Sequence, residues 1–190
     1  MSKKVENELA SLGMKKVRFA VERKELEGRE GENPRSLPRL NEKGMDQVQF
    51  LLSPNPGEDL KPLAKIASGG ELSRIMLALK SIFSEETGVK TLIFDEVDAG
   101  IGGGVAEVVG RKLKEIAKHH QVFCITHLAQ IAALADSHYR VSKRTHGGRT
   151  FVEVGRLAGE ERLEEIARML GVTGKTLDHA REMLRSAQKE

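Results

Sequence analysis

Two short apolar runs separated by an amphipathic stretch constrain the fold of this chain more than any other feature. The runs are Thr91–Phe94 and residues 122–126, and their length is typical of buried strands. Between them, residues 105–117 carry apolar side chains at helical spacing. A strand, a helix and a second strand in this order form a parallel pair. We therefore expect an α/β fold with a mainly parallel sheet flanked by helices.

The remaining patterns predict further elements on both sides of this unit. Before it we expect a helix over residues 1–12, strands near 17–21 and 47–52, a loop over 26–40 and a turn at 53–57. A helix should follow, with an apolar face formed by Leu72, Ile75, Met76, Leu79 and Phe83. After the unit we expect an antiparallel hairpin of residues 139–142 and 150–154, joined through His146-Gly147-Gly148, and helices near 163–170 and 177–184.

Composition indicates an ordinary globular domain. The chain has 190 residues, of which 39% are hydrophobic and 31% charged, which suffices for one domain with a core. The net charge of +3 and the absence of tryptophan indicate neither a nucleic-acid surface nor a base-stacking platform. No apolar run approaches the roughly 20 residues of a membrane helix, and the first residues lack a secretory signal. The single cysteine, Cys124, lies in an apolar run, so we expect a small buried residue in a cytoplasmic protein.

Two adjacent carboxylates, Asp95 and Glu96, follow the first apolar run directly. Open α/β sheets bind their ligands at the carboxyl ends of strands. Phosphoryl transfer needs one carboxylate to hold Mg²⁺, directly or through water, and another group to orient or deprotonate the attacking water. We expect Asp95 in the first role and Glu96 in the second; solvent-facing acids at a strand end would give the same pattern.

The segment Ser68-Gly69-Gly70-Glu71 precedes the helical pattern that contains Leu72. Ser68 and Glu71 have the spacing of a capping box. Capping leaves Gly69 and Gly70 unexplained, because glycine in a first helical turn weakens a helix by up to ~1 kcal/mol. Glycines at this place expose backbone N–H groups at the positive end of the helix. The segment therefore predicts a phosphate-binding helix start.

Two other polar positions, His127 and Asp98, lie near the predicted strand ends. His127 follows the second apolar run, where a histidine is either structural or contacts a terminal phosphate or its attacking water. Asp98 opens a glycine-rich stretch, residues 98–104, which either only connects strand to helix or lets a neighbouring subunit approach with Asp98 as the polar contact.

The sequence contains no phosphate loop. Residues 171–176 resemble one, but Met169 stands where the first glycine of that motif is required. The segment also follows a predicted helix, whereas a phosphate loop follows a strand. We interpret it as a turn between two helices.

In their order and spacing these motifs resemble the ATP-binding-cassette heads of the SMC-like family. Residues 68–71 resemble the family's signature motif, residues 92–96 its Walker B strand, Asp98 its D-loop acid and His127 its switch histidine. The resemblance implies the C-terminal lobe of a split ATPase head, in which residues 1–12 end a coiled-coil arm and residues 13–190 form the lobe. The chain departs from a full head because it lacks the Walker A and Q-loop segments.

The resemblance also implies a division of labour. An N-terminal lobe with Walker A would bind ATP and Mg²⁺, while this chain would supply Asp95 as the metal carboxylate and Glu96 and His127 as catalytic residues. Ser68, Gly69, Gly70 and Glu71 would grip the ATP of a second head, so that ATP joins a homodimer and hydrolysis releases it. The expected setting is nucleoid-associated and cytoplasmic, with DNA as a partner in double-strand-break repair and recombination and with no membrane partner.

Two alternatives from other functional classes stay open. A non-catalytic module would bind a partner head through its signature face without hydrolysing ATP. A Mg²⁺-dependent nuclease would use Glu96 and Asp98 with Asp95, would cut DNA without nucleotide, and would leave residues 68–71 without a role.

Overall fold

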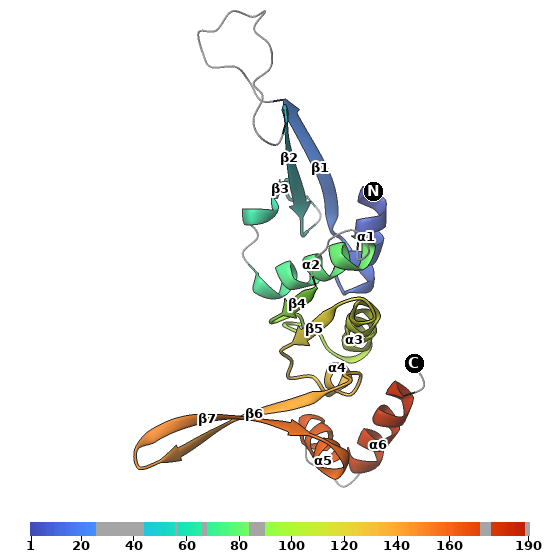
Figure 1. Cartoon of the computed structure of the whole chain (residues 1–190). Coiled ribbons are helices and arrows are strands. Elements are labelled where there is room, and N and C mark those ends of the chain that lie inside the picture. Colours follow the sequence, from blue (N-terminus) through green and yellow to red (C-terminus); the bar gives the residue numbers. More distant parts are fainter. Residues whose placement is uncertain (26–43, 56, 66–67, 84–89, 172–175, 189–190) are drawn as a thin grey trace, which may run out of the picture. The chain divides into compact units, whose positions relative to one another are not determined.

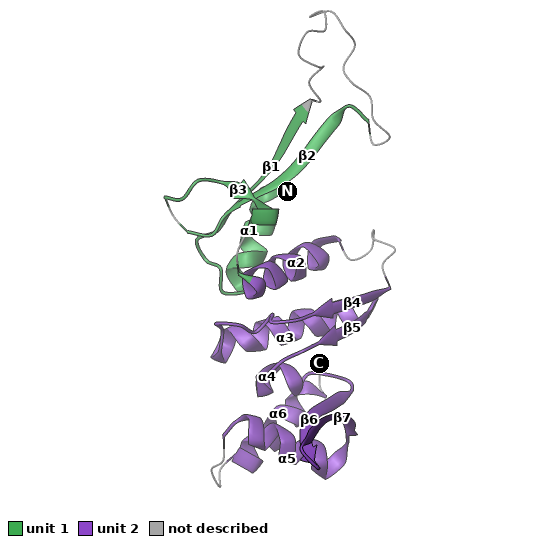
Figure 2. Ribbon diagram, turned by 90° about the vertical axis from the view of Figure 1, so that its left-hand side faces the viewer, with its two compact units in different colours: residues 1–68 green, residues 69–190 purple. Residues whose placement is uncertain are grey.

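The computed structural model describes residues 1–25, 44–55, 57–65, 68–83, 90–171 and 176–188 (Figure 1). The chain divides into two compact units, residues 1–68 and residues 69–190, which are coloured separately in Figure 2. No helix within these ranges is both long and apolar enough to cross a membrane. The boundary after Ser68 separates two groups of residues that pack mainly among themselves. The coiled-coil arm expected at residues 1–12 stays a prediction.

The first unit is one helix packed on a small antiparallel sheet. Its elements are α1 (Ser2–Ser11), β1 (Arg18–Glu25), β2 (Asp46–Ser53), β3 (Lys61–Pro62) and the 3₁₀ helix η1 (Leu63–Lys65). The sheet order is β1-β2-β3, and Phe19 on β1 lies opposite Leu52 on β2. Glu6 on α1 accepts a hydrogen bond from the Phe19 N–H at 2.9 Å, which fastens the helix to the strand.

The predicted helix, strands and turn of this unit are confirmed. Val5 and Leu9 on α1 are fully buried, as their shared stripe indicates. The turn after β2 is closed by the Ser53 hydroxyl, which donates to the carbonyls of Asn55 at 2.9 Å and Glu58 at 3.0 Å. The loop expected at residues 26–40 lies outside the described residues. β3 and η1 were not predicted, because two or three residues are too few to show a periodicity.

The second unit contains the expected strand-helix-strand arrangement and a hairpin with helices. Its elements are α2 (Gly69–Phe83), β4 (Thr91–Phe94), α3 (Gly103–Ala117), β5 (Gln121–Cys124), α4 (Ala129–Ala132), β6 (His138–His146), β7 (Arg149–Leu157), α5 (Gly159–Met169) and α6 (Thr176–Ala187). β4 and β5 are parallel, with Phe94 opposite Cys124, and α3 is the crossover between them. The α/β class is therefore confirmed, together with the parallel pair and the antiparallel hairpin.

One face of the parallel pair is packed and the other is open. Leu92 and Phe94 are buried, as the sequence predicts for both strands. The opposite face, formed by Ile93, Phe123 and Ile125, is exposed by 71%, 49% and 60%. We call these three side chains the uncovered face. The prediction that both strands are fully buried was therefore wrong. Parallel sheets are normally covered on both faces, and the described residues cover this pair on one face only.

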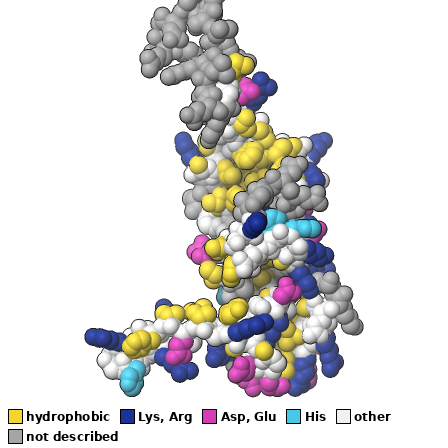
Figure 3. Space-filling model, in the orientation of Figure 1, with side chains coloured by type: hydrophobic (Ala, Val, Ile, Leu, Met, Phe, Trp, Pro, Cys, Tyr) yellow, Lys and Arg dark blue, Asp and Glu magenta, His cyan; other side chains and the backbone are white. Residues whose placement is uncertain are grey.

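The hairpin of β6 and β7 closes through Gly147 and Gly148. Both glycines have positive φ, of 58° and 76°, and a two-residue hairpin turn of type I′ requires positive φ at both positions. Each strand has nine residues, longer than predicted. One hairpin face carries four exposed apolar side chains, those of Tyr139, Val141, Val152 and Val154. Figure 3 shows yellow apolar side chains along the projecting arm.

A small core joins α4, α5 and α6. Its buried members are Ala129, Ala132, Ala133, Leu163, Ile166, Ala167 and Ala180. Arg162 on α5 donates to the carbonyls of Ala132, Ala133 and Ala135 and so caps the carboxyl end of α4. The turn predicted at residues 171–176 follows helix α5 as expected, and α6 begins at Thr176; residues 172–175 lie outside the described residues.

Candidate functional site

The carboxyl end of β4 leads into a tight loop, residues 95–99, which we call the acid loop. Asp95 and Glu96 are both exposed there. Glu96 has φ of 55° and is the only non-glycine residue with positive φ among those described. The Glu96 N–H donates to Asp95 Oδ1 at 2.9 Å, and the Ala99 N–H donates to the Glu96 carbonyl at 3.0 Å. A left-handed glutamate costs on the order of 1–3 kcal/mol, so its surroundings must hold it.

Helix α2 supplies that support. The Ser73 hydroxyl donates to the Asp95 carbonyl at 2.6 Å. Arg74 Nη1 donates to the carbonyls of Ala99 at 2.7 Å and Val97 at 3.4 Å. Arg74 is buried, and burial lowers the pKa of its guanidinium while nearby Glu71 opposes that effect. Alternate carbonyls of the acid loop are thus bound from one helix.

The sequence did not identify Ser73 and Arg74. The one sequence feature that could have indicated Arg74 is its positive charge next to Ile75, on the apolar side of α2. The predicted apolar face was partly wrong: Leu72 and Met76 are exposed, and Arg74, Leu77 and Ala78 are buried in their place. Arg74 is buried because the carbonyls of the acid loop, which lies against this helix, accept its hydrogen bonds.

The glycines of the segment 68–71 lie against the acid loop. α2 begins at Gly69, directly after Ser68, as the capping box predicts. A Cβ atom on Gly69 would collide with Glu96 Oε2. A Cβ on Gly70 would lie 2.7 Å from Ala99 Cβ and 3.0 Å from the Glu96 carbonyl oxygen. Close approach of the acid loop is thus a second reason for glycine, besides bare N–H groups.

At the end of β5, His127 is held by Asp98. Asp98 Oδ2 accepts hydrogen bonds from the Thr126 hydroxyl at 2.6 Å and the His127 N–H at 2.8 Å, and lies 2.9 Å from His127 Nδ1. The Asp98 side chain is 4% exposed and that of His127 is 71% exposed. The sequence left open whether the stretch that Asp98 begins only connects strand to helix or also contacts a neighbouring subunit; within this chain the Asp98 carboxylate is buried and hydrogen-bonded.

Cys124, the last residue of β5, has an unreactive thiol. It is half-buried, not fully buried as expected. Burial, and to a smaller extent the negative charges of Asp98 and Asp95, together raise the pKa of its thiol to about 12. The thiol therefore stays protonated near neutral pH, which agrees with the unreactive residue that the sequence predicts.

The exposed acids fit part of a Mg²⁺ site. Mg²⁺ in phosphoryl-transfer sites is usually bound by one or two carboxylates together with substrate phosphates and water. Asp95 and Glu96 offer such carboxylates. No cluster of three or more His, Cys, Asp or Glu side chains suited to a metal occurs in the described ranges. A nuclease site of Asp95, Glu96 and Asp98 would also need the Asp98 carboxylate to be accessible, and it is buried.

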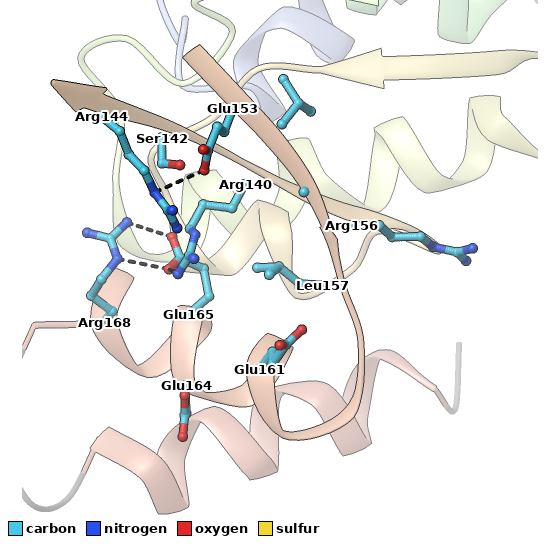
Figure 4. A pocket seen from close by; sticks show the side chains of 12 residues that line it. Arg140, Ser142, Arg144, Glu153, Arg156, Leu157, Glu161, Glu164, Glu165 and Arg168 are labelled. Atoms are coloured by element: carbon cyan, nitrogen blue, oxygen red, sulfur yellow. Dashed lines mark hydrogen bonds and ion pairs between the residues drawn. The ribbon is translucent and has the colours of Figure 1, made fainter. Parts of the chain in front are cut away.

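A separate pocket lies between the hairpin and α5 (Figure 4). Glu165, which is buried at its base, receives two hydrogen bonds from Arg168, at 2.9 Å and 2.6 Å, and lies 3.7 Å from Arg140. On the hairpin, Arg144 pairs with Glu153 at 3.0 Å. The pocket's charges are thus largely paired with one another, and the Arg140–Glu165 pair links the hairpin to α5.

Glu165 gives this fastening a predictable pH dependence. Hydrogen bonds from Arg168 lower the pKa of Glu165 most, burial opposes them, and the charges of Arg168, Arg140 and His138 add to the lowering. A lowered folded-state pKa means that the stabilisation is present above the unfolded value, about 4.3, and is lost as pH falls through the folded value. Glu165→Gln is expected to lower the free energy of unfolding at pH 7 by about 1.5–3 kcal/mol.

Urea unfolding at pH 7 and at about pH 3 checks this expectation. The difference between the original chain and Glu165→Gln should shrink at the acid pH. The matched control is Glu164→Gln, which alters an exposed acid on the same helix and should have little effect. A difference that is equally large at both pH values would contradict the assignment.

Comparison with known proteins connects this site to one family. No protein-family model matches the chain. The chain is 49% identical over 187 residues to the DNA repair protein RecN of Halalkalibacterium halodurans, 45% identical over 196 residues to RecN of Bacillus subtilis, and 52% identical over 143 residues to RecN of Deinococcus radiodurans. These matches cover 97%, 100% and 74% of the chain but only 32%, 34% and 25% of the relatives.

Among solved structures, the Smc head domain with a coiled coil and joint from Pyrococcus yayanosii matches 88% of the chain with a TM-score of 0.54. The sequence identity is 22%, and the match covers 28% of that chain. At this identity the likeness shows the fold alone, which confirms the predicted head-type α/β architecture.

Proposed function

Because this chain corresponds in sequence to the C-terminal part of the RecN family of DNA repair proteins, we propose that it is one lobe of an ATPase head. It would hydrolyse ATP only when joined to an N-terminal lobe that carries the phosphate loop. The chain spans about a third of the length of its relatives, which leaves room for such a lobe. Repair of DNA double-strand breaks would then be the task of the complete protein.

One observation supports the proposal more than any other. The candidate site residues are in place at the carboxyl ends of β4 and β5, but only one face of this sheet is covered. Asp95 and Glu96 follow β4, His127 follows β5, and these strand ends are adjacent because the strands are parallel and in register. The uncovered face consists of Ile93 on β4, Phe123 on β5 and Ile125 directly after β5. A two-stranded sheet with one bare face needs a further layer for stability.

Within a complete head, the residues of this chain would divide the chemistry. Mg²⁺, held in part by Asp95, would neutralise charge on the transferred phosphate. Glu96 would orient or deprotonate the attacking water. His127, on the neighbouring strand end, would contact the region of the terminal phosphate. Asp98 would hold His127 in place.

The signature segment would act on a second head. Ser68 and the Gly69 and Gly70 N–H groups lie at the start of the 15-residue helix α2, where backbone donors and the helix dipole favour an anion. We expect them to bind the terminal phosphate of ATP held by the partner head. ATP would thereby join two heads, and hydrolysis would release them.

Mixing this chain with a separately produced N-terminal lobe of the same protein tests the proposal. ATPase activity is expected in the mixture and in neither part alone. Ile93→Glu, which places a charge on the uncovered face, should abolish the complex and the activity. Ser186→Glu, which places the same charge at an exposed position of α6, should leave both unchanged.

Three results would contradict the half-head proposal. ATP hydrolysis by the chain alone would show that no second lobe is required. Stable binding to a partner head without hydrolysis in any mixture would favour a non-catalytic module. DNA cleavage that requires Mg²⁺ but no nucleotide would favour the nuclease.

A further inference from the structure

The contact between Asp98 and His127 fixes one nitrogen of the imidazole ring. Oδ2 of Asp98 lies 2.9 Å from His127 Nδ1 and also accepts from the His127 N–H and the Thr126 hydroxyl. The Thr126 oxygen in turn accepts from the Leu128 N–H at 3.0 Å, so its own hydrogen is free to point at Asp98. The histidine is thus held on its Nδ1 side while most of its ring is exposed.

The chemistry of these groups decides where the hydrogens are. A carboxylate only accepts hydrogen bonds, so the ring nitrogen that faces it must carry hydrogen. A neutral imidazole carries one ring hydrogen, which leaves Nε2 without one. Three donors that converge on one oxygen are the arrangement expected for a carboxylate anion.

The geometry points to Asp98 as the positioning residue of His127, which it holds in the Nδ1–H tautomer with Nε2 facing outward. The consequence of this tautomer for catalysis rests on the proposed function. In the neutral ring, Nε2 accepts a hydrogen bond from water. A hydrogen bond from Nε2 to a phosphate oxygen requires the ring to take up a second proton, and Asp98 would stabilise that imidazolium.

This role explains why Asp98 is buried within the glycine-rich loop. A carboxylate that contacted another subunit would need exposure, whereas one that orients a histidine needs shielding from water. Thr126 and the His127 N–H also hold the carboxylate, so the ring cannot rotate away without breaking its contact with Asp98. The orientation of His127 is thus set by a residue of the other strand end.

Nuclear magnetic resonance of ¹⁵N-labelled imidazole rings in the full chain tests the tautomer directly. Spectra are recorded at about pH 8.5, where free histidine is neutral. His127→Gln assigns the signals among the six histidines. We expect Nδ1–H for His127 and a shift toward Nε2–H in Asp98→Asn. Asp178→Asn, which removes the same charge from an 82% exposed side chain of α6, should leave the tautomer unchanged.

Two outcomes overturn the inference: an Nε2–H form of His127 in the unaltered chain, or an unchanged Nδ1–H form in Asp98→Asn. Should Asp98→Asn fail to fold, the tautomer of the unaltered chain decides. In the two-lobe mixture, Asp98→Asn is also expected to lower kcat about 10²-fold with little change in KM. Absence of ATPase in the unaltered mixture would count against the proposed function alone, because the tautomer is measured without nucleotide.

Discussion

Replacing Glu96 by glutamine is expected to lower ATP hydrolysis by the assembled head ~10²–10⁴-fold, the usual effect of losing a general base. Glutamine has nearly the same shape, so it can occupy the exposed left-handed position after Asp95. Its amide cannot take a proton from the attacking water. ATP binding and head pairing should persist, and the closed dimer should therefore accumulate.

Single-turnover ATPase assays and light scattering with and without ATP measure the two parts of this expectation. Glu115→Gln on α3 is the matched control, because that acid is 64% exposed and lies outside the acid loop. Its turnover should equal that of the original protein. Unchanged turnover in Glu96→Gln would remove Glu96 from the mechanism.

Gly70→Ala is expected to lower the free energy of unfolding by on the order of 1–2 kcal/mol. The new Cβ would lie 2.7 Å from Ala99 Cβ and 3.0 Å from the Glu96 carbonyl oxygen, neither of which can move without shifting the acid loop. Overpacking of this kind costs typically 1–3 kcal/mol, and the better helix propensity of alanine offsets about 0.5–1 kcal/mol. The urea midpoint of the chain measures the effect.

The neighbouring variant Gly69→Ala separates stability from activity. Its Cβ would meet only the far end of the flexible Glu96 side chain, which can turn aside at small cost to folding. The urea midpoint should therefore change little. The displaced carboxylate should still lower hydrolysis by the assembled head, by at least about tenfold. Equal loss of stability in both variants would show that the two glycines have no distinct roles.

The elements of the fold that have a clear hydrophobic pattern were predictable from the sequence. β4 and β5 are apolar runs of strand length, α3 repeats its apolar residues at helical spacing, and Gly147-Gly148 marks the hairpin turn. What the sequence could not show was that half of the sheet is bare. Ile93 and Phe123 are residue types that are usually buried, and only the structure shows that, among the residues it describes, both side chains are exposed.

The candidate site divides in the same way. The acids after β4 and the histidine after β5 were predictable, because ligands bind at the ends of parallel strands. The partners of Asp98 lie 28 and 29 residues further along the chain, and no local pattern encodes such a contact. The left-handed backbone of Glu96 is likewise invisible in the sequence, since it is imposed by hydrogen bonds from Ser73 and Arg74 to the surrounding carbonyls.

Ser73 and Arg74 bind the acid loop to α2 through hydrogen bonds, so we expect the start of that helix and Glu96 to shift together. In a pair of heads as proposed, the helix start would sense the partner's nucleotide while Glu96 would act on its own. Any influence of one nucleotide on the other would then be mutual, with the same free energy in both directions. Binding of ATP at either site would then change the affinity of the other site for ATP, so the two sites would not bind nucleotide independently.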